Sequence, residues 1–256
     1  MGTFYVITGA SRGLGEALVR RVLREPGSRV LGVARSRSER LMEEAGTAGA
    51  RLDWLEFDLA SGDWNRLSGQ LGERMEQVQA EGNVERWRLI NNAGVLEPIG
   101  PAQDADLYAA ELNIAVNLTA PMALTSAFLR LTEAYGGDRR ILNISSGAGR
   151  KPYFGWSSYC AAKAGLDHFT RCLKLEQDAL ANGAKVVSAA PGVIDTAMQA
   201  SIRAADVSRF RDKARFVQLH ESGGLLSPDD AAERLLRLLE MPEFGDEPVV
   251  DIRDFS

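Results

Sequence analysis

The sequence predicts an α/β fold built on one doubly wound parallel sheet with helices on both faces. Short apolar runs rich in β-branched residues alternate with longer amphipathic stretches along the chain. A glycine-rich turn separates the first run from the first amphipathic stretch. No internal repeat, low-complexity tract or Pro/Gly-rich linker marks a boundary, and 256 residues suffice for one full core. A single domain over residues 1–256 is therefore expected.

The elements follow from these patterns in chain order. Strands are predicted at residues 4–8, 29–33, 52–57, 88–91, 140–145, 185–189 and 248–252. Helices are predicted at residues 14–24, 63–79, 107–134, 157–181 and 229–239, with lengths that suit right-handed crossovers between parallel strands. This is the Rossmann arrangement, for which the seven strands are expected in the order 3-2-1-4-5-6-7. Residues 197–227 break the alternation with small and charged side chains, which predicts a lid over a substrate site.

Charge and composition exclude several classes of partner. A formal net charge of -5 and a pI near 5.3 argue against a surface for nucleic acid or anionic membranes. Cys160 and Cys172 stand in one predicted helix and suit neither a disulfide framework nor a metal site, which favours a reducing compartment. With His168 and His220 as the only histidines, no metal is expected.

The first residues carry no targeting pattern. Met1 and Gly2 lead directly into a predicted strand, without a charged region, a long apolar region or a cleavage site. Val6 stands where a myristoylation signal has Ser or Thr. No apolar run reaches the length of a membrane span. A cytoplasmic protein without a membrane partner is expected.

The turn after the first strand is a candidate phosphate-binding loop. It reads Thr8-Gly9-Ala10-Ser11-Arg12-Gly13-Leu14-Gly15, and a helix begins within it. Glycines let the backbone approach a pyrophosphate, and a helix N-terminus offers unpaired N–H groups to it. The glycine spacing differs from the common G-x-G-x-x-G pattern, but the strand-turn-helix context favours a dinucleotide over a simple turn.

The end of the second strand discriminates between the two nicotinamide cofactors. An NAD site has an acid there for the ribose 2′-hydroxyl, whereas residues 27–38 contain none. Arg35 and Arg12, with the neighbouring Ser36, would instead surround a 2′-phosphate, which guanidinium groups suit. The alternative for each arginine is a solvated side chain. NADP(H) is the predicted cofactor.

Tyr159 and Lys163 form a candidate acid–base pair. They stand one helical turn apart, and Ser146 lies thirteen residues upstream at the end of a predicted strand. The lysine charge is expected to favour the phenolate and lower a tyrosine pKa of about 10 toward neutrality. A Tyr four residues before a Lys is also common on solvated helices, so this pair needs support from the rest of the chain.

That support is an ordered set of motifs over nearly the whole chain. The set comprises Thr8-Gly9, Gly13-Leu14-Gly15, Asp58-Leu59, Asn91-Asn92-Ala93-Gly94, Asn117, Ser146, Tyr159, Lys163, Pro191-Gly192 and Thr196. In this order and spacing the chain resembles the short-chain dehydrogenases/reductases. The resemblance implies that Asp58 holds the adenine edge, and that Lys163 also holds the ribose of the nicotinamide. It implies that Asn117 interrupts a helix and supports a water relay to the lysine.

The same resemblance implies the other cofactor contacts and the assembly. These contacts are Leu59, Asn92, Ala93, Gly94, Pro191, Gly192, Val193 and Thr196. The implied reaction is reduction of a small-molecule carbonyl: Ser146 and Tyr159 hydrogen-bond the oxygen, NADPH delivers hydride, and Tyr159 gives the proton. A homodimer through residues 107–134 and 157–181 is also implied.

Three segments look like a narrower branch of this family. Residues 151–160, 191–199 and 250–255 resemble the sepiapterin reductases and (S)-benzil reductases. The resemblance implies an aromatic 1,2-diketone substrate of the benzil type, with a pterin side chain as the alternative. It places Asp251 where sepiapterin reductases anchor the pterin; a solvent-facing strand end is the other reading. Tyr153 and Trp156 are expected either to stack on an aromatic substrate or to pack beneath the Tyr159 helix.

Two further readings stay open. A 3-oxoacyl-ACP reductase shares the catalytic set and needs a basic patch for its acidic partner. The predicted lid offers five cationic residues, opposed only by Asp206 and Asp212: Arg203, Arg209, Arg211, Lys213 and Arg215. A mixed, solvated helix face is the other explanation for them, and the favoured one. An NADPH sensor without turnover is the alternative from another class, against which the presence of Asn117, Ser146, Tyr159 and Lys163 together argues.

Overall fold

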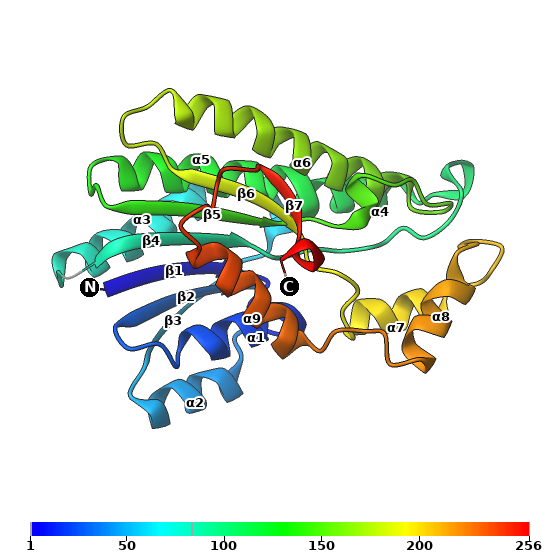
Figure 1. The fold of residues 1–256 in the computed structure, drawn as a ribbon, viewed down its shortest axis with the longest axis horizontal. Coiled ribbons are helices and arrows are strands. Elements are labelled where there is room, and N and C mark those ends of the chain that lie inside the picture. The colour runs from blue at the N-terminus through cyan, green and yellow to red at the C-terminus, as the bar shows by residue number, and fades with distance from the viewer. Residues whose placement is uncertain (1, 83, 256) are drawn as a thin grey trace.

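Seven parallel strands form one sheet in the computed structural model, which describes residues 2–82 and 84–255. The strands are β1 (Gly2–Thr8), β2 (Ser28–Ala34), β3 (Arg51–Glu56), β4 (Val84–Asn91), β5 (Asp138–Ile144), β6 (Lys185–Ala190) and β7 (Val249–Asp251). Their order is β3-β2-β1-β4-β5-β6-β7, with parallel pairing throughout (Figure 1). The predicted strands and their order are confirmed. All the strands therefore end at the same edge of the sheet, where ligands bind in folds of this class.

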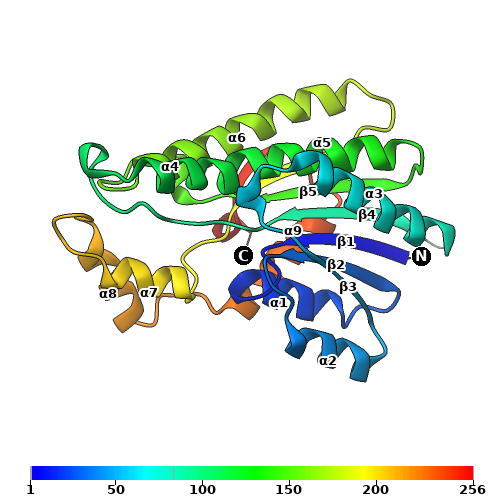
Figure 2. The same cartoon turned by 180° about the vertical axis from the view of Figure 1, so that it is seen from behind.

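Helices cover both faces of the sheet (Figures 1 and 2). One face carries α1 (Gly13–Val22), α2 (Glu39–Ala48) and α9 (Pro228–Glu240). The other carries α3 (Trp64–Ala80), α5 (Ala120–Glu133) and α6 (Ser157–Asp178). Alternate side chains of a strand enter opposite cores: in β1, Tyr5 and Ile7 face α1, whereas Phe4 and Val6 face the other layer.

Helix α2 was not predicted, because its sequence has few apolar positions. Only Leu41 and Ala45 are buried in it, one turn apart. Its boundaries carry local signals nonetheless. The Ser38 hydroxyl accepts a hydrogen bond from Leu41 N at 3.4 Å, and Gly49 ends the helix with a φ of 62°.

The helix predicted over residues 107–134 is interrupted. It consists of α4 (Leu107–Ile114), a π-helical segment (Ala115–Thr119) and α5. A π-helical turn inside an α-helix often occurs at a functional site. The stretch Leu107–Glu133 is long and apolar enough to cross a membrane, but half of its most apolar window is buried in the fold, as in a core helix.

The segment predicted as a lid contains two helices, α7 (Ala197–Ala204) and α8 (Lys213–Glu221). Its two ends are tied together, because Ile194 and Leu226 form a parallel bridge. The excursion thus leaves and rejoins the sheet at one place, beyond the end of β6, and projects from the body of the molecule (Figure 1). Its function as a lid stays a prediction.

Candidate active site

The predicted catalytic side chains meet at the carboxyl end of β5. Ser146 follows this strand and caps a short 3₁₀ helix (Gly147–Gly149), where its hydroxyl accepts a hydrogen bond from Ala148 N at 3.2 Å. Tyr159 lies in the first turn of α6 and is only 7% exposed. Its phenol lies near enough to the Ser146 hydroxyl to interact with it. The two hydroxyl groups can therefore address one carbonyl oxygen together.

Burial dominates the pKa values of the Tyr159–Lys163 pair. It raises the pKa of Tyr159 to about 12, although the hydrogen bond with Ser146 acts in the opposite direction. It lowers the pKa of Lys163 to about 8, although the negative charge of Asp167 opposes this change. The expectation that Lys163 pulls the Tyr159 pKa toward neutrality is wrong for this structure. The Lys163 ammonium instead donates to the Ile144 carbonyl at 2.9 Å and lies 5.8 Å from the centre of the Tyr159 ring.

Asn117 lies in the π-helical segment and connects it to the loop after β4. Its side-chain Nδ2 donates to the Val95 carbonyl at 2.7 Å and to Asn113 Oδ1 at 2.8 Å, while its Oδ1 accepts from Val95 N at 3.2 Å. A Cβ at Gly94 would lie 3.0 Å from Asn117 Oδ1 and 3.9 Å from Lys163 Nζ. The loop after β4, Asn117 and Lys163 therefore approach one another at Gly94. The predicted interruption of the helix at Asn117 is confirmed.

The glycine loop is closely packed against the end of β4. A Cβ at Gly15 would lie 2.1 Å from the Gly9 carbonyl oxygen, and one at Gly9 would lie 2.9 Å from Ala93 Cα. The Thr8 hydroxyl accepts hydrogen bonds from both Asn92 N and Ala93 N at 3.0 Å. Larger side chains at the two glycines would separate the two strand ends.

The N-terminus of α1 has the properties of a phosphate site. Four helices, α2, α3, α4 and α9, have a side chain that caps their first turn. Helix α1, like α6, α7 and α8, begins without such a cap in the described part of the chain, and it directly follows the glycine turn after β1. Its first-turn N–H groups and positive dipole end are thus available to an anion, which fits a dinucleotide pyrophosphate.

The remaining predicted cofactor residues lie along the same edge. Arg12, Arg35 and Ser36 are exposed just beyond the ends of β1 and β2. Asp58 is exposed after β3 and accepts from Ala60 N at 3.0 Å, whereas Leu59 is buried. Pro191, Gly192 and Val193 follow β6, and the Thr196 methyl group lies 3.5 Å from where a Cβ at Gly13 would be. The fold thus gathers residues from both halves of the chain.

Aromatic side chains form a wall beside Tyr159. The Trp156 ring stacks on Phe210 from the predicted lid, with centroids 4.4 Å apart, and meets Tyr159 edge-on at 5.8 Å. Tyr153 packs against Trp156 with centroids 5.0 Å apart. Trp156 is 4% exposed, so it takes the packing role, while Tyr153 is only half-buried. The lid and the catalytic helix share one apolar cluster.

Asp251, which was predicted to bind substrate, instead accepts hydrogen bonds from two arginines. Its Oδ1 accepts from Arg253 N at 3.1 Å and Arg253 Nε at 2.8 Å. Its Oδ2 accepts from Arg150 Nη2 at 2.8 Å and Arg253 Nη2 at 2.6 Å. These hydrogen bonds, above all those from Arg253, lower the pKa of Asp251 to about 2 despite burial. A carboxylate has about four lone-pair sites, so little acceptor capacity is left for a substrate.

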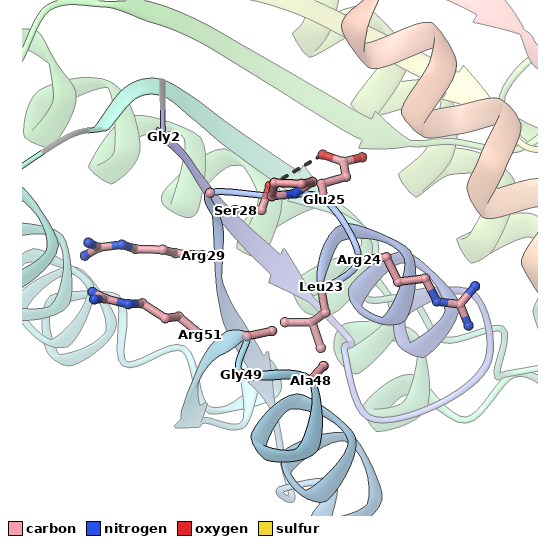
Figure 3. Close-up of a pocket in the computed structure, with 12 residues that line it drawn as sticks. Gly2, Leu23, Arg24, Glu25, Ser28, Arg29, Ala48, Gly49 and Arg51 are labelled. Atoms are coloured by element: carbon pink, nitrogen blue, oxygen red, sulfur yellow. Dashed lines mark hydrogen bonds between the residues drawn. The ribbon is translucent and has the colours of Figure 1, made fainter.

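A cavity of about 590 Å³ lies at the opposite edge of the sheet. It is lined by residues at the starts of β1, β2 and β3, where Arg29 and Arg51 project in the same direction (Figure 3). Both arginines pair with Glu81. This cavity contains none of the predicted site residues, and the amino ends of parallel strands are not where ligands bind in doubly wound sheets.

The family model for short chain dehydrogenases matches residues 3–207. The chain is a member of this family. This short-chain dehydrogenase is therefore an oxidoreductase that acts on CH–OH or C=O groups with a nicotinamide cofactor, NAD(H) or NADP(H).

The relatives of this short-chain dehydrogenase include both predicted enzyme types. A benzil reductase ((S)-benzoin forming) of Bacillus cereus is 39% identical over 249 residues, covering 97% of this chain and 98% of the relative. The sepiapterin reductase of Rattus norvegicus is 34% identical over 258 residues, covering 97% and 95%. The chain thus belongs to the branch of the family that its motifs predict.

Solved structures show the same fold. The crystal structure of the KRED1-Pglu enzyme is 32% identical, with a TM-score of 0.78, and covers 95% of this chain and 98% of its own. A variant actinorhodin polyketide ketoreductase, solved with NADPH, is 26% identical with a TM-score of 0.76, and covers 98% and 95%.

Two residues that shape the site were not predicted. Asn113 is fully buried, and its amide donates to the carbonyls of Val95, Leu96 and Glu97 at 3.3, 3.1 and 2.8 Å. Its position four residues before Asn117, on the same helix face, is a signal that the sequence contains. Arg150 stands four residues after Ser146, but its contact with Asp251 spans 101 positions and leaves no local pattern.

Proposed function

We propose that this enzyme uses NADPH to reduce one carbonyl of an aromatic 1,2-diketone to an (S)-hydroxyketone. The observation that carries the proposal is the arrangement around Tyr159. Its buried phenol lies beside the Ser146 hydroxyl, against the Trp156 ring and at the same sheet edge as the uncapped glycine loop. The relatives named as benzil reductases supply the substrate class.

The proposed roles follow from the positions of the side chains. Ser146 and Tyr159 donate hydrogen bonds to the substrate oxygen, and the Tyr159 proton passes to it as negative charge develops. Lys163 holds the cofactor ribose, and Asn117 supports a water relay to the lysine that replenishes the proton. NADPH, when bound, supplies the hydride. The aromatic wall excludes water, which strengthens the hydrogen bonds to the oxygen.

We propose NADP(H) rather than NAD(H) because of the end of β2. Arg12, Arg35 and Ser36 are exposed there, and no acid lies between residues 27 and 38. Related structures that contain NADP or NADPH support this choice. Replacing Arg35 by Asp should weaken NADPH binding and relatively favour NADH, measured by titration of nucleotide fluorescence. An unchanged ratio of the two dissociation constants would remove the basis of the choice.

The direct test is NADPH oxidation with benzil, with the chirality of the benzoin determined. The expected product is (S)-benzoin. Sepiapterin and acetoacetyl thioesters are tested beside it, and faster turnover of either would replace the proposal by the corresponding reductase. Tight NADPH binding without turnover of any of these carbonyls would indicate the sensor function.

We also propose that the enzyme is a homodimer. Exposed apolar side chains lie on the helices that the family resemblance implies as the interface. They are Leu107 and Tyr108 on α4, Met122 on α5 and Leu175 on α6. Leu175 is 73% exposed. Light scattering should give twice the chain mass of 27.8 kDa, and Leu175→Lys should lower it.

A further inference from the structure

Asp251 holds two arginines in fixed positions at the carboxyl edge of the sheet. The Asp251 side chain is 6% exposed, whereas those of Arg150 and Arg253 are 41% and 61% exposed. The buried carboxylate therefore orients guanidinium groups whose outer N–H donors face solvent. Arg150 uses only Nη2 in this contact, and Arg253 uses Nε and Nη2 of its side chain. Each guanidinium keeps donors for another partner.

The arginine pair lies at the same edge of the sheet as the catalytic tyrosine. Arg150 ends the short turn that Ser146 begins, and Asp251 pairs with Ala190 at the end of β6. On the other side, Tyr153 lies near Arg253. Tyr153 connects to Tyr159 through Trp156, over centroid distances of 5.0 and 5.8 Å. The three rings thus form one chain of contacts that ends at the catalytic tyrosine.

Further cations surround the same aromatic ring. The Lys151 ammonium lies 5.4 Å from the centre of the Tyr153 ring. Arg215 of the lid donates to the Tyr153 hydroxyl at 3.2 Å. Acidic side chains near the lid are placed elsewhere: Asp104, Asp106 and Asp206 line a cavity between α7 and the loop before α4. Asp254 is the other carboxylate beside Arg253. Cations therefore predominate around Tyr153.

We propose that Arg150 and Arg253 bind an anionic group, such as a carboxylate, on the end of an aromatic substrate remote from the reacting carbonyl. This inference rests on the proposed function and names its substrate class more closely. Asp251 is then a positioning residue whose charge fixes the two guanidinium groups. Guanidinium groups suit carboxylates because their N–H donors match the two oxygens in one plane.

The test compares benzil with benzil-4-carboxylate, which carries the same diketone and one added charge. Dissociation constants are measured from tryptophan fluorescence in the presence of NADP⁺, which does not permit reduction, and KM is measured with NADPH. The wild type should bind the carboxylate about fivefold more tightly than benzil, as expected for a partly exposed ion pair. High salt should reduce this preference.

Arg150→Gln and Arg253→Gln are made singly, so that one arginine always remains on Asp251 and the fold is kept. Each variant should lose most of the preference for the carboxylate, measured as the ratio of the two dissociation constants. Arg24→Gln is the matched control, since Arg24 is exposed at the opposite edge of the sheet. This control variant should bind both substrates as the wild type does.

Equal binding of the two substrates by the wild type, or a preference that both variants retain, overturns the inference. The proposed function is tested separately, by whether either diketone is turned over. Turnover of benzil without any charge preference keeps the proposed function and rejects the arginine site. An arginine-dependent preference in binding, without turnover of either diketone, keeps the arginine site and rejects the proposed function.

Discussion

At the scale of single residues, burial decides which proton is available. A Tyr159 phenol with a pKa of about 12 stays protonated throughout the neutral range. It can therefore donate a hydrogen bond to a ground-state carbonyl and release the proton only when an alkoxide forms. The low exposure of Lys163, at 4%, has the opposite effect on a cation and lowers its pKa to about 8.

Replacing Tyr159 by Phe should abolish most of the turnover and leave NADPH binding almost unchanged. The variant loses the proton donor and keeps the ring that packs against Trp156. We expect kcat with benzil to fall by a factor of about 10³, within the range for general acid catalysis. The NADPH dissociation constant should stay within about threefold of wild type, since one hydrogen bond at most is lost. A variant with nearly wild-type kcat would show that another group is the acid.

Replacing Lys163 by Met should flatten the pH dependence of stability in the cofactor-free protein. The folded pKa of about 8 lies below the usual lysine value, so between about pH 8 and 10.5 the unfolded chain holds the extra proton. The wild type therefore gains stability as pH rises through this window, by about 3 kcal/mol. Urea unfolding at pH 7.5 and 10.5 measures the gain. Parallel changes in the two proteins would mean that Lys163 is not desolvated.

The sequence predicted which residues lie together in the site but not the pKa values of these residues. The spacing of Ser146, Tyr159 and Lys163 follows from a strand end and one helical turn, both of which are local. The charge effects depend on partners that are distant or unpatterned. Lys163 donates to the Ile144 carbonyl, which any residue could provide, and one of the two arginines that bind Asp251, Arg150, is 101 positions away in the chain.

At the scale of elements, the lid is held in close contact with two loops, the one after β4 and the one before α6. The Arg209 side chain donates to the Ile99 carbonyl at 2.8 Å. Gly155 has a φ of 85°, and a Cβ there would lie 2.0 Å from the Arg209 carbonyl oxygen. The backbone of the lid therefore lies directly on a glycine, where other residues would not fit. This contact keeps Phe210 fully buried against Trp156.

Replacing Gly155 by Ala should detach the lid while the sheet stays folded. The new Cβ clashes with backbone and strains a left-handed conformation, at a cost of at least about 1–2 kcal/mol. We expect trypsin to cleave residues 209–215 several times faster than in the wild type, because local opening becomes easier. Gly46→Ala is the control: a Cβ at Gly46, inside helix α2, would meet nothing within 4 Å. Equal cleavage rates in the wild type and Gly155→Ala would contradict the contact.

Strands were easier to predict than the helices that surround the site. A central parallel strand is apolar on both faces, so β1 is evident as a continuous apolar run from Phe4 to Ile7. Helix α2 buries two side chains, and the π-helical segment differs from its neighbours only in hydrogen bonding. In the lid, α7 and α8 are short and pack on residues distant in the chain, such as Tyr153 and Trp156, so their sequences carry little periodicity.

At the scale of the whole molecule, the carboxyl edge and the amino edge of the sheet have different roles. The carboxyl edge presents the glycine loop, Ser146 and the arginine pair. The amino edge contains a network in which Arg88, fully buried, donates to Glu240 Oε1 and Asp138 Oδ2 at 2.7 Å each. These contacts join β4, β5 and α9. Changes at the amino edge should therefore affect stability with little effect on the chemistry of the site.

Replacing Arg88 by Met tests this separation. The variant leaves Glu240 and Asp138 without their buried cation, so the free energy of unfolding at pH 7 should fall by about 3 kcal/mol. Burial would raise the pKa of Asp138, but Arg88 and then Arg140 outweigh it and lower this pKa. That contribution is present above the unfolded pKa of about 4 and is lost as pH falls through the folded value.

The deficit of Arg88→Met relative to the wild type should accordingly shrink in acid, as measured by chemical unfolding between pH 7 and 3. Arg237→Gln, which removes an exposed pair with Glu233, is the control and should show no measurable change. The kcat with benzil at 25 °C should stay near wild type in Arg88→Met, because its contacts lie at the starts of the strands and the reacting groups at their ends. A large loss of kcat in a folded Arg88→Met protein would show that the two edges are coupled.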